Sequence, residues 1–180
     1  LLEDPNELLP VKRSAVEGLA ESREEKSVDV LVTMLSEENE LEADIVKAIS
    51  RKSGTAMITR ILSHVEQADQ RLRRLLVQAL KSMGESAETV LESLVFDLDS
   101  VLRDVTVEIL EKIGSVDSRI RHLTNRDVSV RREAAAFLAQ VGTKSAYRGL
   151  VLAAKDPDEE VRAHVVRALD ALASDKGQKL

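Results

Sequence analysis

The sequence predicts an all-α fold, an α-α superhelix (solenoid) of about 11 helices arranged as five to six helical pairs. Three observations support this prediction: a repeat of about 30 residues, helical spacing of apolar residues inside each repeat, and few aromatic residues. Hydrophobic residues make up 43% of the 180 positions, but aromatic residues only 2%. A core of Leu, Val, Ile and Ala suits closely stacked helices, because rings usually fill the wider spaces between layers.

Single glycines mark the end of each repeat. Gly54, Gly84, Gly114 and Gly142 are separated by 30, 30 and 28 residues. Each follows one amphipathic run and precedes another, which is where a helix needs a left-handed C-terminal cap. We therefore expect positive φ angles at these four glycines.

An apolar anchor followed by a basic residue marks the second helix of each pair. Leu72, Leu102, Val130 and Val161 are each followed by arginine, and weaker copies stand at Leu41-Glu42 and Val11-Lys12. The second helices are expected to start near residues 11, 41, 72, 102, 130 and 161.

Apolar residues at helical spacing then predict the individual helices in order. In the first unit the leading helix is missing, since the chain opens with the turn-like Asp4-Pro5 and continues into the helix at Val11. The later leading helices are predicted by five apolar groups: Val28, Leu31, Val32 and Leu35; Met57, Ile58, Ile61, Leu62 and Val65; Val90, Leu91, Leu94 and Val95; Ile120 and Leu123; and Tyr147, Leu150, Val151 and Ala154. The second helices are predicted by Leu41, Ile45, Ala48 and Ile49; Leu72, Leu76, Ala79, Leu80 and Met83; Leu102, Thr106, Ile109, Leu110 and Ile113; Val130, Ala134, Phe137, Leu138 and Val141; and Val161, Val165, Ala168, Leu169 and Leu172.

An aspartate stands four residues before each anchor arginine. Such a residue can cap the following helix by accepting its free N–H groups. It can also pair with that arginine or with the equivalent arginine of the adjacent repeat. We interpret the series as a structural Asp/Arg ladder, made of Asp69, Arg73, Asp99, Arg103, Asp127, Arg131, Asp158 and Arg162.

These residues resemble the HEAT-like repeats first described in phycobilisome lyases, whose units carry a turn Asp, often Asp-Pro, then Val-Arg and an Ala/Leu-rich helix ending in Gly. The stretch 156–162, Asp-Pro-Asp-Glu-Glu-Val-Arg, matches closely, and 127–142 matches well. The resemblance covers about residues 4–173. It implies one solenoid domain over 1–180, with two layers of helices and the second helices lining a concave side.

Several functional classes are disfavoured by what the sequence lacks. It contains no Cys, which excludes disulfides and thiolate metal sites and favours a cytoplasmic location. His64, His122 and His164 are scattered, with no HExxH spacing, and there is no Gly-x-Ser-x-Gly elbow. Residues 1–100 carry a net charge of −8 and residues 101–180 a net charge of +2, which disfavours nucleic acid as a partner. No apolar run is long enough to span a bilayer. We therefore predict no catalytic, cofactor-binding or metal-binding residues and no enzymatic activity.

The predicted function is a non-catalytic scaffold that binds another protein on its concave face. Residues expected to project there from the second helices are Arg74, Gln78, Lys81, Asp104, Glu108, Arg132, Gln140 and Arg167. Charge reversal at Arg74 and Arg132 is expected to weaken binding with little loss of stability. A cluster of five arginines within 14 residues is a second candidate patch; it comprises Arg119, Arg121, Arg126, Arg131 and Arg132.

Three alternatives stay open. The family resemblance implies a lyase-like subunit of a chromophore attachment system. The missing leading helix suggests a segment of a larger scaffold, and the unpaired first helix suggests self-association.

Overall fold

The computed structural model describes residues 5–37, 40–96 and 102–177, with side chains described for residues 9–37, 40–96 and 102–171. Across these segments the chain forms eleven α-helices, one 3₁₀ turn and no β-strand, so the predicted all-α fold and helix number are confirmed. None of these helices is both long and apolar enough to cross a membrane.

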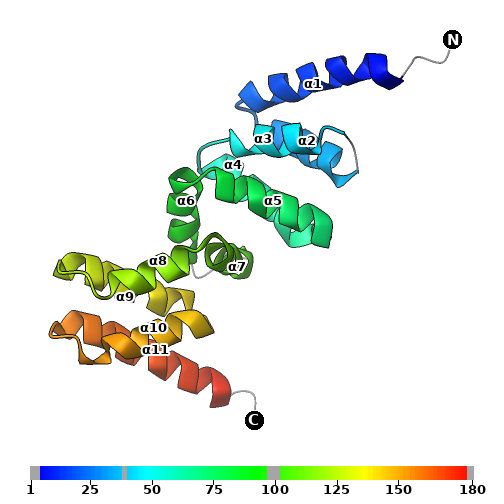
Figure 1. Cartoon of the computed structure of the whole chain (residues 1–180). Coiled ribbons are helices and arrows are strands. Elements are labelled where there is room, and N and C mark those ends of the chain that lie inside the picture. Colours follow the sequence, from blue (N-terminus) through cyan, green and yellow to red (C-terminus); the bar gives the residue numbers. More distant parts are fainter. Residues whose placement is uncertain (1–4, 38–39, 97–101, 178–180) are drawn as a thin grey trace. The chain divides into compact units, whose positions relative to one another are not determined.

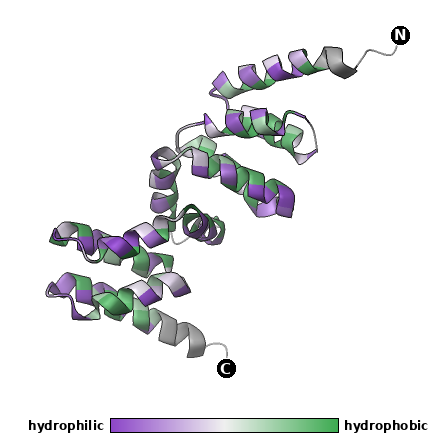
Figure 2. Cartoon of the chain, viewed as in Figure 1, coloured by the Kyte–Doolittle hydropathy of each residue, from purple (hydrophilic) through white to green (hydrophobic). Residues whose placement is uncertain are grey.

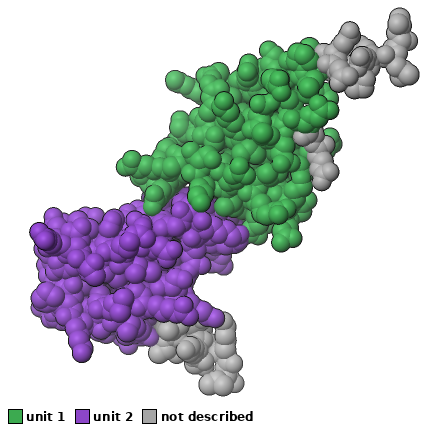
Figure 3. All heavy atoms as spheres, viewed as in Figure 1, with its two compact units in different colours: residues 1–90 green, residues 91–180 purple. Residues whose placement is uncertain are grey.

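The chain divides into two compact units, residues 1–90 and residues 91–180 (Figure 3). The division falls inside α6 (Glu85–Val95). The prediction that residues 1–180 form one domain stays a prediction.

Unit 1 is a two-layered stack of helices (Figure 1). One layer holds α1 (Pro5–Glu21), α3 (Glu42–Ser50) and α5 (Gln70–Ser82), and the other holds α2 (Lys26–Ser36) and α4 (Thr55–Gln67). Helix α3 packs against both α1 and α5, while α2 packs against α1, α3 and α4. The fully buried side chains between them are aliphatic and follow the predicted spacing; they include Leu31, Leu35, Ile45, Ile49, Ile58, Ile61, Leu62, Leu76 and Leu80.

Unit 2 repeats this arrangement. Its helices after α6 are α7 (Arg103–Ile113), α8 (Ser115–His122), α9 (Val128–Val141), α10 (Lys144–Leu152), the 3₁₀ turn η1 (Ala153–Lys155) and α11 (Glu159–Gly177). Helix α9 packs against α8, α10 and α11, and α10 packs against α8 and α11. Each helix carries a hydrophobic and a hydrophilic side (Figure 2), and the hydrophobic sides supply the core residues Ile109, Leu110, Ala134, Ala135, Leu138, Ala146 and Leu150.

All four repeat glycines have positive φ angles, as predicted. Gly114 and Gly142 are the left-handed C-terminal caps of α7 and α9. Gly54 differs, because it lies beyond the end of α3 and serves as the N-cap residue of α4.

The first helix departs from the sequence prediction. Helix α1 begins at Pro5 rather than near Val11, and the Val11 side chain is exposed. Val16 and Ala20, further along α1, supply its buried contacts instead.

The predicted buried face of α10 is wrong in part: Leu150 is buried as predicted, but Val151 and Ala154 are not. Val151 is 56% exposed, and Ala154 in η1 is also exposed, whereas Ala146, Gly149 and Leu150 are buried. Helix α10 turns a different face inward from the one predicted, because Gly149 lies directly against α8. A Cβ atom at Gly149 would come within 2.6 Å of Ile120 Cγ1. The absence of a side chain at Gly149 therefore allows this face of α10 to pack against α8.

Candidate protein-binding face and its cross-repeat ion pairs

Ion pairs join neighbouring repeats within unit 1 and within unit 2. Their members lie between 25 and 31 residues apart, which is close to one repeat. Because equivalent positions of stacked repeats lie side by side, opposite charges at such a spacing meet across the interface between repeats. The pairs are Arg13–Asp44, Glu21–Arg51, Asp29–Arg60, Glu42–Arg71, Glu92–Arg119, Arg131–Asp156 and Arg132–Asp158.

In unit 1 the densest of these contacts is centred on Asp29 of α2. Its carboxylate accepts hydrogen bonds from Arg60 Nε at 2.6 Å and Arg60 Nη2 at 2.9 Å, and lies 2.7 Å from His64 Nε2. The Arg60 guanidinium, together with His64, lowers the pKa of Asp29 to about 2. His64 of α4 thus contacts Asp29 across the interface between two repeats.

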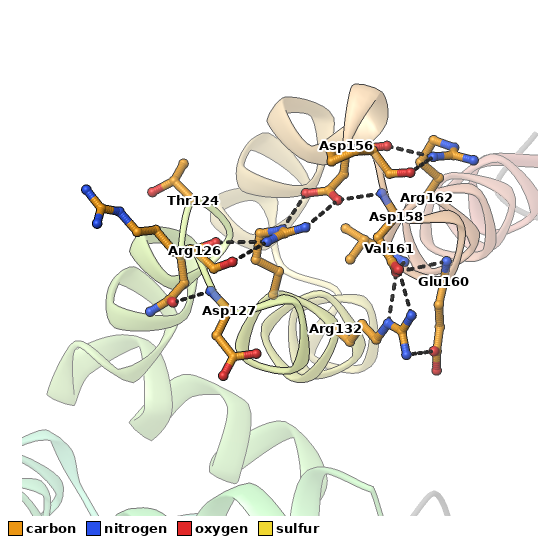
Figure 4. Close-up of polar contacts among 12 residues, drawn as sticks. Thr124, Arg126, Asp127, Arg132, Asp156, Asp158, Glu160, Val161 and Arg162 are labelled. Atoms are coloured by element: carbon orange, nitrogen blue, oxygen red, sulfur yellow. Dashed lines mark hydrogen bonds and ion pairs between the residues drawn. The ribbon is translucent and has the colours of Figure 1, made fainter.

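In unit 2 the most enclosed pair joins α9 to the turn before α11 (Figure 4). Arg131 Nε lies 2.9 Å from Asp156 Oδ2, and the two side chains are only 13% and 7% exposed. The hydrogen bond from Arg131 lowers the pKa of Asp156. The carboxylate is held in this charged form by a bidentate guanidinium, the strongest ion-pair geometry available to arginine.

Asp158 has two structural tasks. It caps α11 by accepting hydrogen bonds from the Glu160 and Val161 N–H groups at 3.1 Å, and it accepts one from Arg132 Nε at 2.9 Å (Figure 4). The Arg132 hydrogen bond is the main reason why the pKa of Asp158 lies far below its usual value. Asp158 thus pairs with Arg132 rather than with either anchor arginine, Arg131 or Arg162.

The other residues of the predicted ladder have separate roles. Asp69 caps α5 through the Leu72 N–H at 2.8 Å, and Asp127 caps α9 through the Ser129 N–H at 2.9 Å. Arg73 is half-buried in α5, and Asp99 lies outside the described residues. The other two arginines donate hydrogen bonds to backbone carbonyls: Arg103 to that of Gln140, and Arg162 to those of Asp156 and Pro157.

The cluster of five arginines is largely committed to the fold. Arg119 pairs with Glu92 and places its guanidinium 5.4 Å from the Phe137 ring centroid, a cation–π contact. Arg131 and Arg132 form the pairs described above, which leaves Arg121 and Arg126 exposed. Most of this positive charge is therefore neutralised between repeats.

The eight residues expected to bind a partner fall in both units. In unit 1, Arg74, Gln78 and Lys81 form an exposed polar stripe on α5. In unit 2, Asp104 is exposed on α7, and Glu108 forms an ion pair with Lys112. Arg132 forms ion pairs with Asp158 and Glu160. Gln140 and Arg167 line one hollow.

That hollow, here called the α9/α11 hollow, is lined by residues of α9 and α11 and by Phe96. Its volume is about 300 Å³, and its lining residues are Phe96, Ala136, Ala139, Gln140, His164, Arg167, Ala168 and Ala171. Four alanines leave the space open because their side chains are short. Phe96, which follows α6, is 53% exposed, and the Gln140 amide donates to the carbonyl of the preceding Val95 at 3.2 Å. Gln140 thus holds the segment that presents the ring.

His164 and Arg167 supply the polar side of the α9/α11 hollow. Arg167 Nη2 donates to His164 Nδ1 at 3.0 Å. Burial lowers the pKa of His164, and the charge on Arg167 lowers it further, so the imidazole is neutral at pH 7. The hollow therefore combines one positive charge, an alanine floor and one exposed aromatic ring.

Sequence reasoning places Ala136 among the residues that project from the second helices, but it missed Phe96 and the other three alanines that line this hollow. Phe96 is one of only three aromatic residues and directly follows the apolar run that ends at Val95, which is the one signal that points to it. In the sequence the alanines are indistinguishable from ordinary helix-forming residues. The packing of α9 against α11 brings them together.

A buried lysine of unit 1 is also structural. Lys52 Nζ donates to the Ser22 carbonyl at 2.7 Å, to Ser27 Oγ at 2.8 Å and to the Leu19 carbonyl. Burial lowers the pKa of Lys52, while Glu21 opposes the change. Lys52 satisfies carbonyls at the end of α1 and leaves no reactive amine in the adjoining hollow. Within the described segments no three His, Asp or Glu residues are placed to hold a metal ion.

The chain is similar to one protein family and to several solved structures. A family profile described as HEAT repeats matches residues 116–179, so this part of the chain carries HEAT-like repeats. No curated protein sequence matches the chain significantly. Among solved structures, the chain is similar to an engineered protein at 19% identity, covering 90% of both chains with a TM-score of 0.37. It is also similar to a designed armadillo repeat protein in complex with a (KR)4 peptide, at 15% identity over 94% of this chain and 95% of that one, with a TM-score of 0.35. A second designed armadillo repeat protein has 16% identity, the same coverage and a TM-score of 0.33.

Proposed function

We propose that the chain is a non-catalytic scaffold of the cytoplasm that binds a segment of another protein in the α9/α11 hollow. The observation that carries this proposal is the exposed Phe96 ring beside an alanine-floored hollow with Arg167 at its edge. Exposed aromatic residues and arginines are the residue types that dominate protein–protein binding energy.

The chemistry of the hollow defines the segment that fits it. An apolar side chain of the partner would rest on the alanine floor and against the Phe96 ring. A carboxylate of the partner would meet Arg167, whose neighbour His164 adds no second charge. We therefore propose a partner segment that carries an acidic residue close to an aliphatic one. No arrangement in the described residues favours the lyase-like alternative, and we do not propose it.

Selection of binding peptides from a random library displayed on phage tests this function. The full chain serves as bait, and enriched peptides are measured against Phe96→Ala and Arg167→Glu variants. Both variants are expected to weaken binding about tenfold or more, because each removes a central contact of the interface.

Arg148→Glu is the control, since Arg148 is an exposed arginine of α10 that does not line the α9/α11 hollow. Arg132 is unsuitable as a test residue because its loss breaks the pair with Asp158. The proposal is wrong if no peptide is enriched, or if enriched peptides bind all variants equally.

A further inference from the structure

Lys52 occupies a position that is apolar in the following repeats. It lies eleven residues after the anchor Leu41, and the residues at this offset from the next three anchors are Met83, Ile113 and Val141. Lys52 is nevertheless only 4% exposed. Burying a charged group costs desolvation free energy, and such departures from the local pattern of a fold are expected at functional sites. The surroundings of Lys52 are therefore a candidate site.

The Lys52 ammonium group has no carboxylate partner among the described residues. It donates to the Leu19 and Ser22 carbonyls and to Ser27 Oγ, all of which are uncharged. Burial lowers the pKa of Lys52, and the charge on Glu21 offsets only part of this effect. Glu21 pairs with Arg51 instead. Buried charges in proteins are normally paired, so this one lacks the counter-ion expected for it.

A hollow of about 440 Å³ adjoins Lys52 where the turn after α1 meets the turn after α3. We call it the Lys52 hollow. Three of its lining side chains are basic and one is acidic, which gives a net formal charge of +2. The lining residues are Ala20, Glu21, Ser22, Arg23, Arg51, Lys52, Ser53 and Met57.

Three lining residues carry donors that no described group of the fold uses. The exposed side chains of Arg23 and Ser53 form no hydrogen bond or ion pair within the described segments. The Arg51 guanidinium donates to Glu21 through Nη2 alone. Glu25, which belongs to the same turn as Arg23, lines a different hollow and so leaves this positive charge in place.

We propose that the Lys52 hollow binds a phosphate group, either as free phosphate or as a phosphomonoester. Such a group carries a charge of about −1.5 to −2 at pH 7 and several strong acceptor oxygens, which match the charge and the free donors of the lining. Arg23, Arg51 and Ser53 donate to the phosphate oxygens. Lys52 supplies charge rather than a hydrogen bond, because its donors are already used.

A carboxylate would balance only half of the charge in the Lys52 hollow, and therefore fits it less well than a phosphate group. The Lys52 hollow belongs to unit 1 and shares no residue with the α9/α11 hollow. The proposal is therefore independent of the function proposed above.

Titration of sodium phosphate into the ¹⁵N-labelled full chain tests this site. The pH is held at about 7, where phosphate is largely dianionic, and sodium chloride keeps the ionic strength constant. Amide signals of Ser22, Arg23, Ser53 and Gly54 are expected to shift and to saturate, with a dissociation constant of about 1 mM.

Two variants test the named contacts. Arg23→Gln is expected to weaken phosphate binding about tenfold, because it removes a charge-assisted hydrogen bond. Its side chain is exposed and has no described partner, so the fold should be unaffected. Lys52→Met places in this repeat the residue type of the equivalent Met83, and it should weaken binding at least about tenfold by removing the buried charge.

Lys12→Gln is the matched control, because it removes one positive charge from an exposed position of α1 that does not line the Lys52 hollow. It should leave phosphate binding unchanged. Circular dichroism of each variant establishes that it is folded.

A short peptide that contains phosphoserine, compared with the same peptide containing serine, distinguishes the two sources of the phosphate group. Tighter binding of the phosphopeptide than of inorganic phosphate would assign the hollow to a phosphorylated segment of a partner. Weaker binding of the phosphopeptide would assign it to the free anion.

Three outcomes would overturn the proposal. The first is an absence of saturable shifts up to about 10 mM phosphate. The second is the same set of shifts in sodium chloride alone, which would indicate general screening of charge. The third is phosphate binding that neither Arg23→Gln nor folded Lys52→Met weakens.

Discussion

At the scale of single residues, arginine–carboxylate contacts one repeat apart are the recurrent polar feature of this protein. Their exposure varies widely: Arg13 and Asp44 are about half exposed, whereas Arg131 and Asp156 are nearly enclosed. Exposed pairs contribute about 0–1 kcal/mol each, because water and salt screen them and long side chains lose freedom. The contribution of each pair therefore depends on how far the neighbouring helices exclude water.

The Asp29 contact predicts a specific dependence of stability on acid. Arg60 and His64 lower the folded-state pKa of Asp29 to about 2, below its ordinary value of 3.8. Between about pH 4 and pH 2 the folded chain therefore binds fewer protons at this site than the unfolded chain does, so stability falls as the pH falls through this window. Asp29→Asn removes that contribution. The difference in unfolding free energy between wild type and Asp29→Asn should shrink as the pH falls from about 4 towards 2.

Urea unfolding followed by circular dichroism at a series of pH values measures this difference. Glu111→Gln is the control, because Glu111 is an exposed carboxylate with no ion pair among the described residues. A difference between wild type and Asp29→Asn that does not change with pH would show that the Arg60 contact does not stabilise the folded chain.

At the scale of helices, the sequence pattern was sufficient for the number and order of elements. Helices α3, α5, α7, α9 and α11 each begin within two residues of a predicted anchor, because the aspartate caps and the apolar period both act locally. The rotation of a helix about its axis is set by its neighbours instead. Glycine has a low helix propensity, yet Gly149 is the residue at which α10 contacts Ile120 of α8.

The dependence on how neighbouring helices pack also limited the prediction of the polar contacts. The spacing of the Asp/Arg series correctly placed caps at Asp69, Asp127 and Asp158. Which arginine meets which aspartate depends on the offset between stacked helices, and the sequence alone does not contain that offset. Asp158 consequently meets Arg132, one residue beyond the anchor arginine.

Helix α10 gives a prediction at this scale. In Gly149→Ala the new Cβ would lie 2.6 Å from Ile120 Cγ1 and 3.3 Å from Cγ2, both on a β-branched side chain with little freedom to move. Overpacking of this kind costs about 1–3 kcal/mol, which exceeds the gain of up to about 1 kcal/mol in helix propensity. Gly149→Ala should therefore lower the free energy of unfolding.

Gly18→Ala is the matched control, because Gly18 lies inside α1 and a Cβ there meets nothing within 4 Å. It should leave stability unchanged or raise it by up to about 1 kcal/mol. Thermal and urea unfolding of the two variants separate the effects. Equal stabilisation by both would mean that α8 and α10 are not in close contact at Gly149.

At the scale of the whole molecule, stability is expected to be local. Among the described residues, the extensive contacts between helices join members of the same or the adjacent repeat, and the chain divides into two compact units. In such repeat proteins the stability is approximately a sum of terms for each repeat and for each interface between neighbours. A change at one interface therefore acts mainly on the helices that share it.

Arg131→Ala tests this expectation by hydrogen exchange. The substitution leaves Asp156 without its bidentate partner at 7% exposure, so the interface between α9 and α11 should open more often. Amides of α9, α10 and α11 should exchange faster, whereas those of α2 and α4 in unit 1 should keep the wild-type rate. Arg121→Ala is the control, because it removes an exposed arginine of the same cluster and should change neither set. A uniform increase in exchange over both units would mean that the chain unfolds as a single cooperative body, contrary to the nearest-neighbour behaviour on which the helical-repeat interpretation depends.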